Sequence, residues 1–439
     1  MDNLNLIYER VFSITREVFT SEEVFGISRD LPLNYIVRKD IDGLFTDSLK
    51  RKKHVAVFGS SKQGKTSLRK KYLSEKDSII IHCSNKWTLE DIHVNILKRA
   101  GFEITQSTKK TATGKYKIIA SLKAKFSPFV TPSVGAEIEN TNQQEITVQP
   151  LELDPEDVND IISALKSLNF QKHVLLEDFH YLNIDAQRDF SIALKAFHEN
   201  SDISFIIIGV WLDENRLTIY NGDLTGRVIS VNADKWAPNE LNEVINKGER
   251  LLNIKFTEEF KSKLIENSFD SVYIVQEACY NVCIEYSIFE TQESLKYIGE
   301  ETNIQQLIKK IVNQQSGRYN DFLTKFGDGF QTTVLEMYKW ILYPLITSQP
   351  DILEKGLRYS EIRHIIQGHH PRGSELNPGN LTQSLKSVAS LQVSKKIQPI
   401  IIDYDETNLR LNVVDKSFIM WLKFQDRNEV LELADLPVD

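Results

Sequence analysis

A glycine-rich turn between an apolar strand and a helix constrains this chain more than any other feature. Residues 59–66 read Gly-Ser-Ser-Lys-Gln-Gly-Lys-Thr, with the apolar run Val55–Phe58 before them and a helix-forming run from Ser67 after them. This spacing is typical of a P-loop, in which two glycines let successive backbone N–H groups point at a bound triphosphate. The turn therefore predicts a phosphate-binding site on an α/β fold.

Individual residues of the loop have distinct predicted roles. Lys65 is expected to reach the β- and γ-phosphate oxygens, and Thr66 to give its hydroxyl to Mg²⁺. The amino end of the following helix adds a positive dipole end. The expected cofactors are ATP and Mg²⁺, and the expected cofactor-binding residues are Gly59, Ser60, Ser61, Lys62, Gln63, Gly64, Lys65, Thr66 and Ser67.

Composition excludes several classes of protein. A length of 439 residues predicts more than one domain, and 41% hydrophobic with 26% charged residues describes a water-soluble globular chain. Three cysteines without metal-site partners, no signal-peptide pattern and no run of 18 apolar residues favour a cytoplasmic location and no membrane partner. The net charge of −8 argues against a protein coated in nucleic acid, although one basic face remains compatible with it.

Apolar runs and helical periods alternate after the loop, which predicts a parallel sheet with helices on both faces. The expected strands are 55–58, 78–83, 174–176, 203–211 and 228–231, and the expected helices are 87–100, 155–168 and 185–199. An inserted β-hairpin is expected at about 105–145, with a basic strand at 120–126 and an acidic strand at 134–139. Cross-strand charge pairing and contact with a partner or nucleic acid are both open for this hairpin.

Two acidic residues, Glu177 and Asp178, end the expected strand 174–176. A P-loop NTPase needs carboxylates at this edge, one to hold Mg²⁺ through water and one to orient or deprotonate the attacking water. By position, Glu177 is the metal-side residue together with Thr66, and Asp178 is the candidate base. The usual order is Asp then Glu, and since Asp is one methylene shorter, slow hydrolysis is expected.

Two further positions bear on hydrolysis. Strand 203–211 ends in Val210 and Trp211, neither of which is suited to polarise a water, where many such folds carry an Asn or Thr that senses the γ-phosphate. Arg227 precedes strand 228–231, where an arginine finger would stand, and an ordinary surface salt bridge is the equal alternative. The expected catalytic residues are Asp178, Glu177 and Arg227.

Two domains are expected after the sheet. Helices starting near Pro238, Thr257 and Ser271 predict a helical lid over residues 236–330. Residues 331–439 read as three helices and a hairpin, which is the winged-helix order, with Pro344 ending the first helix. The expected elements are helices 332–343, 359–367 and 379–391 and strands 397–403 and 409–414.

The winged-helix region contains 12 Lys/Arg against 14 Asp/Glu, so a protein-packing module is favoured over a DNA-binding one, and both stay open. The remaining expected divisions are an N-terminal helical appendage at 1–30 and the P-loop ATPase domain at 31–235.

Residues 59–66, the Glu177-Asp178 strand end, Arg227 and the three-helix lid together resemble the AAA+/STAND branch of P-loop ATPases, near the archaeal replication-initiator clade. The resemblance spans roughly residues 31–290. It implies that the segment before the first strand, including Tyr35, helps to hold the adenine. The family's sensor Arg at the start of the third lid helix is absent, since Ser271-Val272-Tyr273 stands there. Together with the missing sensor Asn, this departure favours a nucleotide-controlled switch over hexamer-style hydrolysis.

The main hypothesis is therefore a slowly hydrolysing STAND/AAA+ regulatory ATPase that switches partner interactions, with bacterial antiviral defence as one setting. It would act through a protein partner or effector chain and form a nucleotide-dependent homo-oligomer. The alternatives are a DNA-handling ATPase of the initiator or helicase-loader type and a non-hydrolysing, nucleotide-locked scaffold.

Overall fold

The computed structural model describes residues 17–27, 30–111, 113–122, 150–331 and 333–438. The chain divides into two compact units, of which one comprises Met1–Val37 with Trp236–Asn313 and the other Arg38–Lys235 with Gln314–Asp439. The C-terminal region thus forms one compact unit with the sheet that carries the P-loop. The domain boundaries expected from the sequence stay a prediction.

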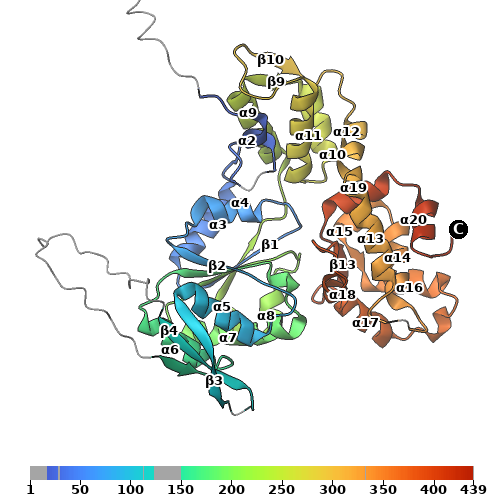
Figure 1. Ribbon diagram of the computed structural model, residues 1–439. Helices are drawn as coiled ribbons and strands as arrows, with labels where there is room; N and C mark the ends of the chain where they lie inside the picture. The colour runs from blue at the N-terminus through green and yellow to red at the C-terminus, as the bar shows by residue number, and fades with distance from the viewer. Residues whose placement is uncertain (1–16, 28–29, 112, 123–149, 332, 439) are drawn as a thin grey trace, which may run out of the picture. The chain divides into compact units, whose positions relative to one another are not determined.

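A five-stranded parallel sheet forms the centre of the larger unit (Figure 1). Its strands are β1 (His54–Phe58), β2 (Ser78–His82), β6 (His173–Glu177), β7 (Phe205–Ile208) and β8 (Val228–Asn232), in the order β2-β6-β7-β1-β8. The strand that precedes the P-loop is therefore separated from the strand that ends in the acidic pair by β7 alone. Because the strands are parallel, the loops that follow β1, β6 and β7 meet at one edge of the sheet.

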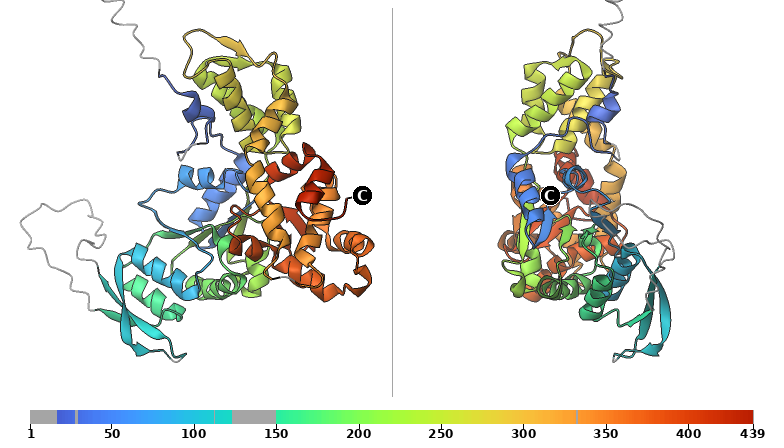
Figure 2. Two further views of the ribbon diagram at one scale, coloured as in Figure 1. Left: turned by 45° about the vertical axis from the view of Figure 1, so that its right-hand side comes forward. Right: turned by 90° about the vertical axis from the view of Figure 1, so that its left-hand side faces the viewer.

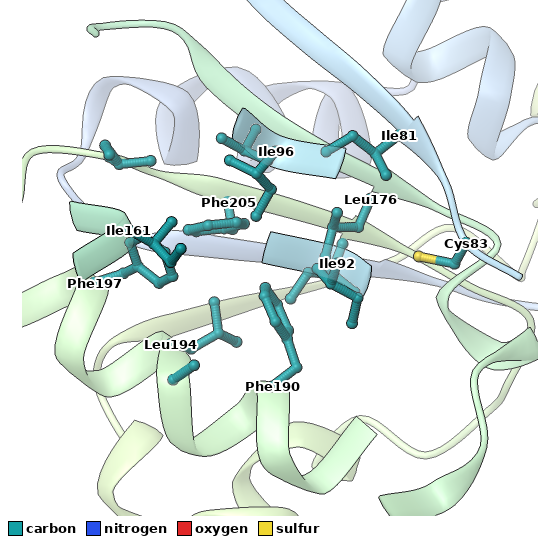
Figure 3. Packing of buried hydrophobic residues seen from close by; sticks show 14 of the residues in the cluster. Ile81, Cys83, Ile92, Ile96, Ile161, Leu176, Phe190, Leu194, Phe197 and Phe205 are labelled. Atoms are coloured by element: carbon teal, nitrogen blue, oxygen red, sulfur yellow. The ribbon is translucent and has the colours of Figure 1, made fainter. Parts of the chain in front are cut away.

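Helices cover both faces of this sheet, as the sequence predicts. On one face, α3 (Lys39–Lys50) and α4 (Lys65–Tyr72) bury Phe45 and Leu68 against Val55 and Val57 of β1. On the other face lie α5 (Leu89–Ala100), α6 (Val158–Ser167) and α7 (Ile184–Asn200). Figure 3 shows the core of this second face, including Ile92, Ile96, Leu176, Phe190, Leu194, Phe197 and Phe205. Burial on both faces explains the nearly continuous apolar runs of these strands.

A second sheet is antiparallel and consists of β3 (Phe102–Lys110), β4 (Tyr116–Leu122) and β5 (Leu151–Leu153). The β3–β4 hairpin extends from the sheet core in both views of Figure 2. The expected start of strand 120–126 was wrong, because β4 begins at Tyr116, where the chain turns back to pair with β3. The expected strand 134–139 lies outside the described residues. Lys109 pairs with Glu152 at 2.9 Å and Lys115 with Glu156 at 2.5 Å. Charge pairing between the expected strands 120–126 and 134–139 stays a prediction.

The smaller unit contains the three expected lid helices. They are α9 (Pro238–Leu252), α10 (Glu258–Asn267) and α11 (Val272–Glu285), joined by α12 (Ile304–Asn313), by α2 (Ser21–Phe25) and by the parallel pair β9 (Ile254–Phe256) and β10 (Lys296–Ile298). Cys279 and Cys283 of α11 are fully buried, and burial raises the pKa of Cys283 to about 12. These thiols are therefore packing residues. Among the described residues, no group of three or more His, Cys, Asp and Glu side chains is placed to hold a metal ion.

The C-terminal region has the expected winged-helix order with altered boundaries. Its elements are α13 (Ser316–Gly327), α14 (Met337–Thr347), α15 (Pro350–Lys355), β11 (Leu357–Arg358), α16 (Tyr359–His369), α17 (Pro378–Lys386), α18 (Val388–Ser394), β12 (Ile402–Asp405), β13 (Arg410–Val413), α19 (Lys416–Lys423) and α20 (Arg427–Leu433). The short strands form an antiparallel sheet in the order β11-β13-β12.

Three details of that region differ from the sequence prediction. Pro344 lies inside α14, because the buried residues around it hold the helix together despite the missing hydrogen bond. The expected third helix is divided at Ser387 into α17 and α18, and the first wing strand starts at Ile402.

Across the described residues, no helix is both long enough and apolar enough to cross a membrane.

Candidate nucleotide site

The P-loop follows β1 and is held in a conformation that only glycine adopts without strain. Gly59 has φ +143° and Gly64 has φ +86°. A Cβ atom on Gly59 would lie 2.8 Å from the backbone nitrogen of Asp234, which follows β8. The Asp234 carboxylate in turn accepts a hydrogen bond from the Ser60 N–H at 2.6 Å. Asp234 therefore fixes the start of the loop, a role that the sequence alone did not reveal.

Lys65 is the first residue of α4, and its side chain is buried under the loop. Its ammonium donates to the carbonyl oxygens of Gly59 at 2.8 Å and Ser60 at 2.6 Å. Burial lowers the pKa of Lys65 to about 8, against the opposing charges of Asp234 and Asp178. An incoming phosphate offers this ammonium stronger acceptors than two carbonyls. The neighbouring Thr66 is exposed, as a residue that binds a metal from the first turn of a helix must be.

Glu177, the last residue of β6, is buried and ion-paired. The guanidinium of Arg69 donates to its Oε1 from Nε at 3.0 Å and from Nη2 at 2.8 Å. His82 Nδ1 lies 3.4 Å from the other carboxylate oxygen. Arg69 sits three residues after Thr66 on α4, so the helix that carries the expected metal hydroxyl also holds the expected metal carboxylate in place. Sequence reasoning missed Arg69, whose only signal was its helical spacing from Thr66.

Asp178 occupies the left-handed region of backbone space, with φ +59° and ψ +31°. Its side chain is about half exposed, and His82 Nδ1 lies 3.7 Å from it. Burial and the charge of Glu177 raise the pKa of Asp178, while His82 and Lys65 oppose the shift. A raised pKa makes a carboxylate a better proton acceptor. Of the two acidic residues, Asp178 is thus the more open to an attacking water.

The remaining predicted residues lie elsewhere. Arg227 precedes β8 at the amino edge of the sheet, where its carbonyl accepts from the His54 N–H at 3.0 Å and its guanidinium pairs with Glu199 at 2.7 Å. That edge is opposite the P-loop, so a finger role for Arg227 stays a prediction and would apply to the site of a second copy. Tyr35 belongs to the other compact unit, where its carbonyl accepts from Lys247 at 2.6 Å, and its adenine role also stays a prediction.

The C-terminal region contacts the P-loop directly, through residues that no sequence motif marks. The Ser61 N–H donates to the Val414 carbonyl at 2.8 Å. The ammonium of Lys416, on α19, lies 3.5 Å from the carboxylate of Asp234 that holds the loop. These contacts make the loop part of the interface between the two halves of the larger unit.

No protein-family model matches the sequence, and no curated protein matches it at a significant level. Among solved structures, the chain is similar to the Walker-type ATPase of Pyrococcus abyssi, with 13% identity, a TM-score of 0.50 and coverage of 91% of this chain and 100% of that one. It is also similar to the ORC2 protein of Aeropyrum pernix in ADPNP-ADP complexes, with 14% identity, a TM-score of 0.45 and coverage of 95% and 98%.

A third similar structure is a STAND protein with a tetratricopeptide repeat sensor from Pyrococcus horikoshii, with 13% identity, a TM-score of 0.36 and coverage of 91% of this chain and 44% of that one. The first similarity shows the fold: this chain has the fold of a Walker-type P-loop ATPase, which confirms the fold class predicted from residues 59–66.

Proposed function

We propose that this chain binds ATP with Mg²⁺, hydrolyses it slowly, and uses the nucleotide state to control its interaction with a protein partner. The observation that carries the proposal is the placement of the buried Lys65 ammonium and its loop at the same sheet edge as Glu177 and Asp178. A cation that binds phosphate beside two carboxylates is the arrangement that phosphoryl transfer requires.

The site residues have separate tasks in this proposal. Lys65 and the loop amides bind the phosphates, and Asp178 accepts a proton from the water that attacks the γ-phosphorus as the bond to the bridging oxygen breaks. The hydroxyl of Thr66 and the carboxylate of Glu177 are oxygen ligands of the kind Mg²⁺ prefers, and would hold it. When bound, Mg²⁺ neutralises charge on the phosphates. The short Asp178 side chain and the apolar end of β7 are both consistent with slow turnover.

Regulation is proposed because the C-terminal region contacts the loop that would move when a nucleotide binds. The bond from Ser61 to Val414 and the approach of Lys416 to Asp234 depend on the conformation of residues 59–61. A change in that conformation therefore alters the docking of the C-terminal region. This change in docking would alter the binding of an effector chain, with bacterial antiviral defence as one setting. It would also control self-association of the chain in a nucleotide-dependent manner.

A DNA-handling ATPase is the less favoured function, for a specific reason. In DNA-binding domains of the helix-turn-helix type, the recognition helix enters the major groove. Here α18 instead packs against the half of the larger unit that carries the parallel sheet. Its Val393 lies in a cluster with Val414 and with Val210, which follows β7. We expect no DNA binding at low salt. Salt-dependent binding that weakens on charge reversal of Lys395 and Lys396 would instead support the initiator or helicase-loader alternative.

The test compares Lys65→Ala with Lys71→Ala, a control that removes an exposed lysine from the same helix. Titration calorimetry with ATP and ADP should show loss of binding only in Lys65→Ala. Asp178→Asn should keep nucleotide affinity and lose phosphate release by roughly a hundredfold. Wild-type affinity and turnover in Lys65→Ala would refute the site. Tight ATP binding without any phosphate release from the wild type would favour the nucleotide-locked scaffold.

A further inference from the structure

His180 lies two residues after Asp178, in the 3₁₀ turn Phe179–Tyr181, and is only 3% exposed. The backbone N–H of Val210 donates to its Nδ1 at 3.2 Å. Nδ1 therefore carries no proton, and the proton of the neutral ring is on Nε2. Burial, together with the charges of Lys65 and Arg216, holds the pKa of His180 well below its usual value, so the ring is neutral.

The Nε2–H of His180 has no hydrogen-bond acceptor among the residues that the structure describes. A buried donor without an acceptor costs free energy, and native proteins contain few of them. Such a group at the edge of a ligand site is readily explained if the ligand supplies the acceptor. His180 is at such an edge, because it follows the acidic pair and its ring bonds to the backbone at the end of β7, the strand between β1 and β6.

The strand order explains why a donor is needed there. β7 lies between β1 and β6, so its end falls between the P-loop and the acidic pair. The residues that follow β7 are apolar: Val210 is buried, and Trp211 stacks on Phe58 with ring centroids 6.4 Å apart. His180 reaches across from the end of β6 to the backbone at the end of β7. Its imidazole thus binds the backbone of Val210, at the strand end where many such folds carry a polar sensor side chain.

We propose that the Nε2–H of His180 donates a hydrogen bond to a γ-phosphate oxygen of bound ATP, so that this side chain distinguishes ATP from ADP. This inference rests on the proposed function and adds to it the residue that reads the terminal phosphate. Hydrogen bonds to charged acceptors are the strong ones, which gives an expected preference of roughly ten- to a hundredfold for ATP over ADP from this contact.

The test uses two replacements of similar length, His180→Gln and His180→Met. The glutamine oxygen can accept from Val210 while its NH₂ group donates to the phosphate, whereas methionine supplies no donor. We expect His180→Met to bind the β,γ-imido analogue of ATP roughly ten- to a hundredfold more weakly, with ADP affinity within about threefold of wild type. His180→Gln should restore the preference to within about threefold of wild type.

His93→Met is the matched control. His93 is also buried, and its Nε2 also has no hydrogen-bond partner among the described residues. It differs in position, because it lies on α5, where its Nδ1 bonds to the Pro155 carbonyl at 2.8 Å. Its replacement should leave the ratio of the two affinities unchanged.

Equal weakening of the binding of both nucleotides in His180→Met, or unchanged affinity for both, overturns the role of His180. If wild type binds neither nucleotide, the proposed function fails instead, so the two failures are distinguishable. Should His180→Met not fold, His180→Leu takes its place, because leucine also supplies no donor; loss of the ATP preference supports the donor role and a wild-type ratio overturns it.

Discussion

Arg69 and Glu177 form a buried ion pair. Both side chains are largely buried, with 12% and 10% exposed, and two N–H groups share one carboxylate oxygen. Burying two charges is costly, and the pair offsets that cost only while both partners are present. The two hydrogen bonds from Arg69 thus hold the carboxylate expected to bind Mg²⁺ in a fixed position.

Removal of one partner should expose that cost. We expect Arg69→Met to lower the free energy of unfolding by about 3–5 kcal/mol, because Glu177 is left as an uncompensated buried charge. Adding Glu177→Gln should recover most of the loss, which urea denaturation of the two variants would measure. Arg99→Met, on the exposed side of α5, is the control and should change little. Additive losses in the double variant would contradict the pairing.

The site residues that the sequence predicts are those defined by local pattern. The roles of residues 59–66 and of the Glu177-Asp178 pair can be predicted from the sequence. In each case a pattern of a few residues, the glycine spacing or an acidic strand end, indicates the function. Arg69, Asp234 and His180 were missed, since each acts through a contact with a segment distant in sequence. Arg227 shows the same limit, because only the strand direction reveals that it lies at the opposite edge from the loop.

At the scale of elements, the β1–α4 turn depends on one close approach. The Cβ of Gly59→Ala would meet the Asp234 backbone at 2.8 Å, in a region of φ that side chains rarely adopt. We expect a loss of about 1–3 kcal/mol in stability and at least a tenfold loss in ATP affinity, measured by thermal denaturation and calorimetry. Gly222→Ala, with open space around its Cβ, should leave both unchanged. Equal effects of the two substitutions would remove the special role of Gly59.

A buried ion pair joins α8 (Arg216–Tyr220) to β12. Arg216 contacts Asp403, Asp213 adds negative charge near the guanidinium, and Asp405 adds negative charge near the Asp403 carboxyl. The arginine also lies over the Trp211 ring, 5.3 Å from its centroid. Burial raises the pKa of Asp403 to about 6, since one cation faces several carboxylates in a space closed to water.

This shift gives a pH dependence with a definite sign. The folded protein protonates Asp403 below about pH 6, whereas the unfolded chain does so near its ordinary value of about 3.9. The contribution of Asp403 to stability is therefore fully present below the unfolded pKa and is lost as pH rises through the folded pKa. Asp403→Asn imitates the protonated form. Its calorimetric melting curve should approach that of wild type below about pH 4 and show the variant more stable near pH 7.5, by roughly 3 kcal/mol. A difference independent of pH would argue against the titration of Asp403.

The elements themselves were largely predictable, whereas their ends and pairings were not. The apolar runs of β1, β6 and β7 identify a parallel sheet because burial on both faces leaves them little polar content. The predicted helix end at Pro344 was wrong, since the packing of α14 outweighs the local free-energy cost of a proline. The helix expected to begin at residue 155 begins later, at Val158, because Asp157 accepts from the Asn159 N–H at 2.9 Å and caps α6.

At the scale of the larger unit, docking of the C-terminal region depends on a small apolar cluster. Val393, Val414 and Ile400 of that region pack with Val210 of the core. We expect Val393→Asp to loosen the docking, because an unpaired charge would be buried there. Hydrogen exchange should then quicken in both α18 and the P-loop, and phosphate release should change with it. Leu433→Asp, at an exposed position on α20, is the control. Quickening confined to α18 would separate the docking from the nucleotide site.

The arrangement of whole domains was the least predictable level. Helix order and charge counts predicted a C-terminal region suited to packing, but nothing in the sequence revealed its partner surface. That surface includes the backbone of the P-loop, and a backbone contact such as that of Ser61 with Val414 has no residue signature.

The apolar contact between α18 and the end of β7 also restricts how the sequence can vary in evolution. Because each segment buries the other, a substitution that enlarges Val210 restricts what position 393 can accept, so the two should vary together among descendants of a common ancestor. A chimera that takes its C-terminal region from a divergent relative should therefore regain function only if the few residues after β7 are exchanged along with it.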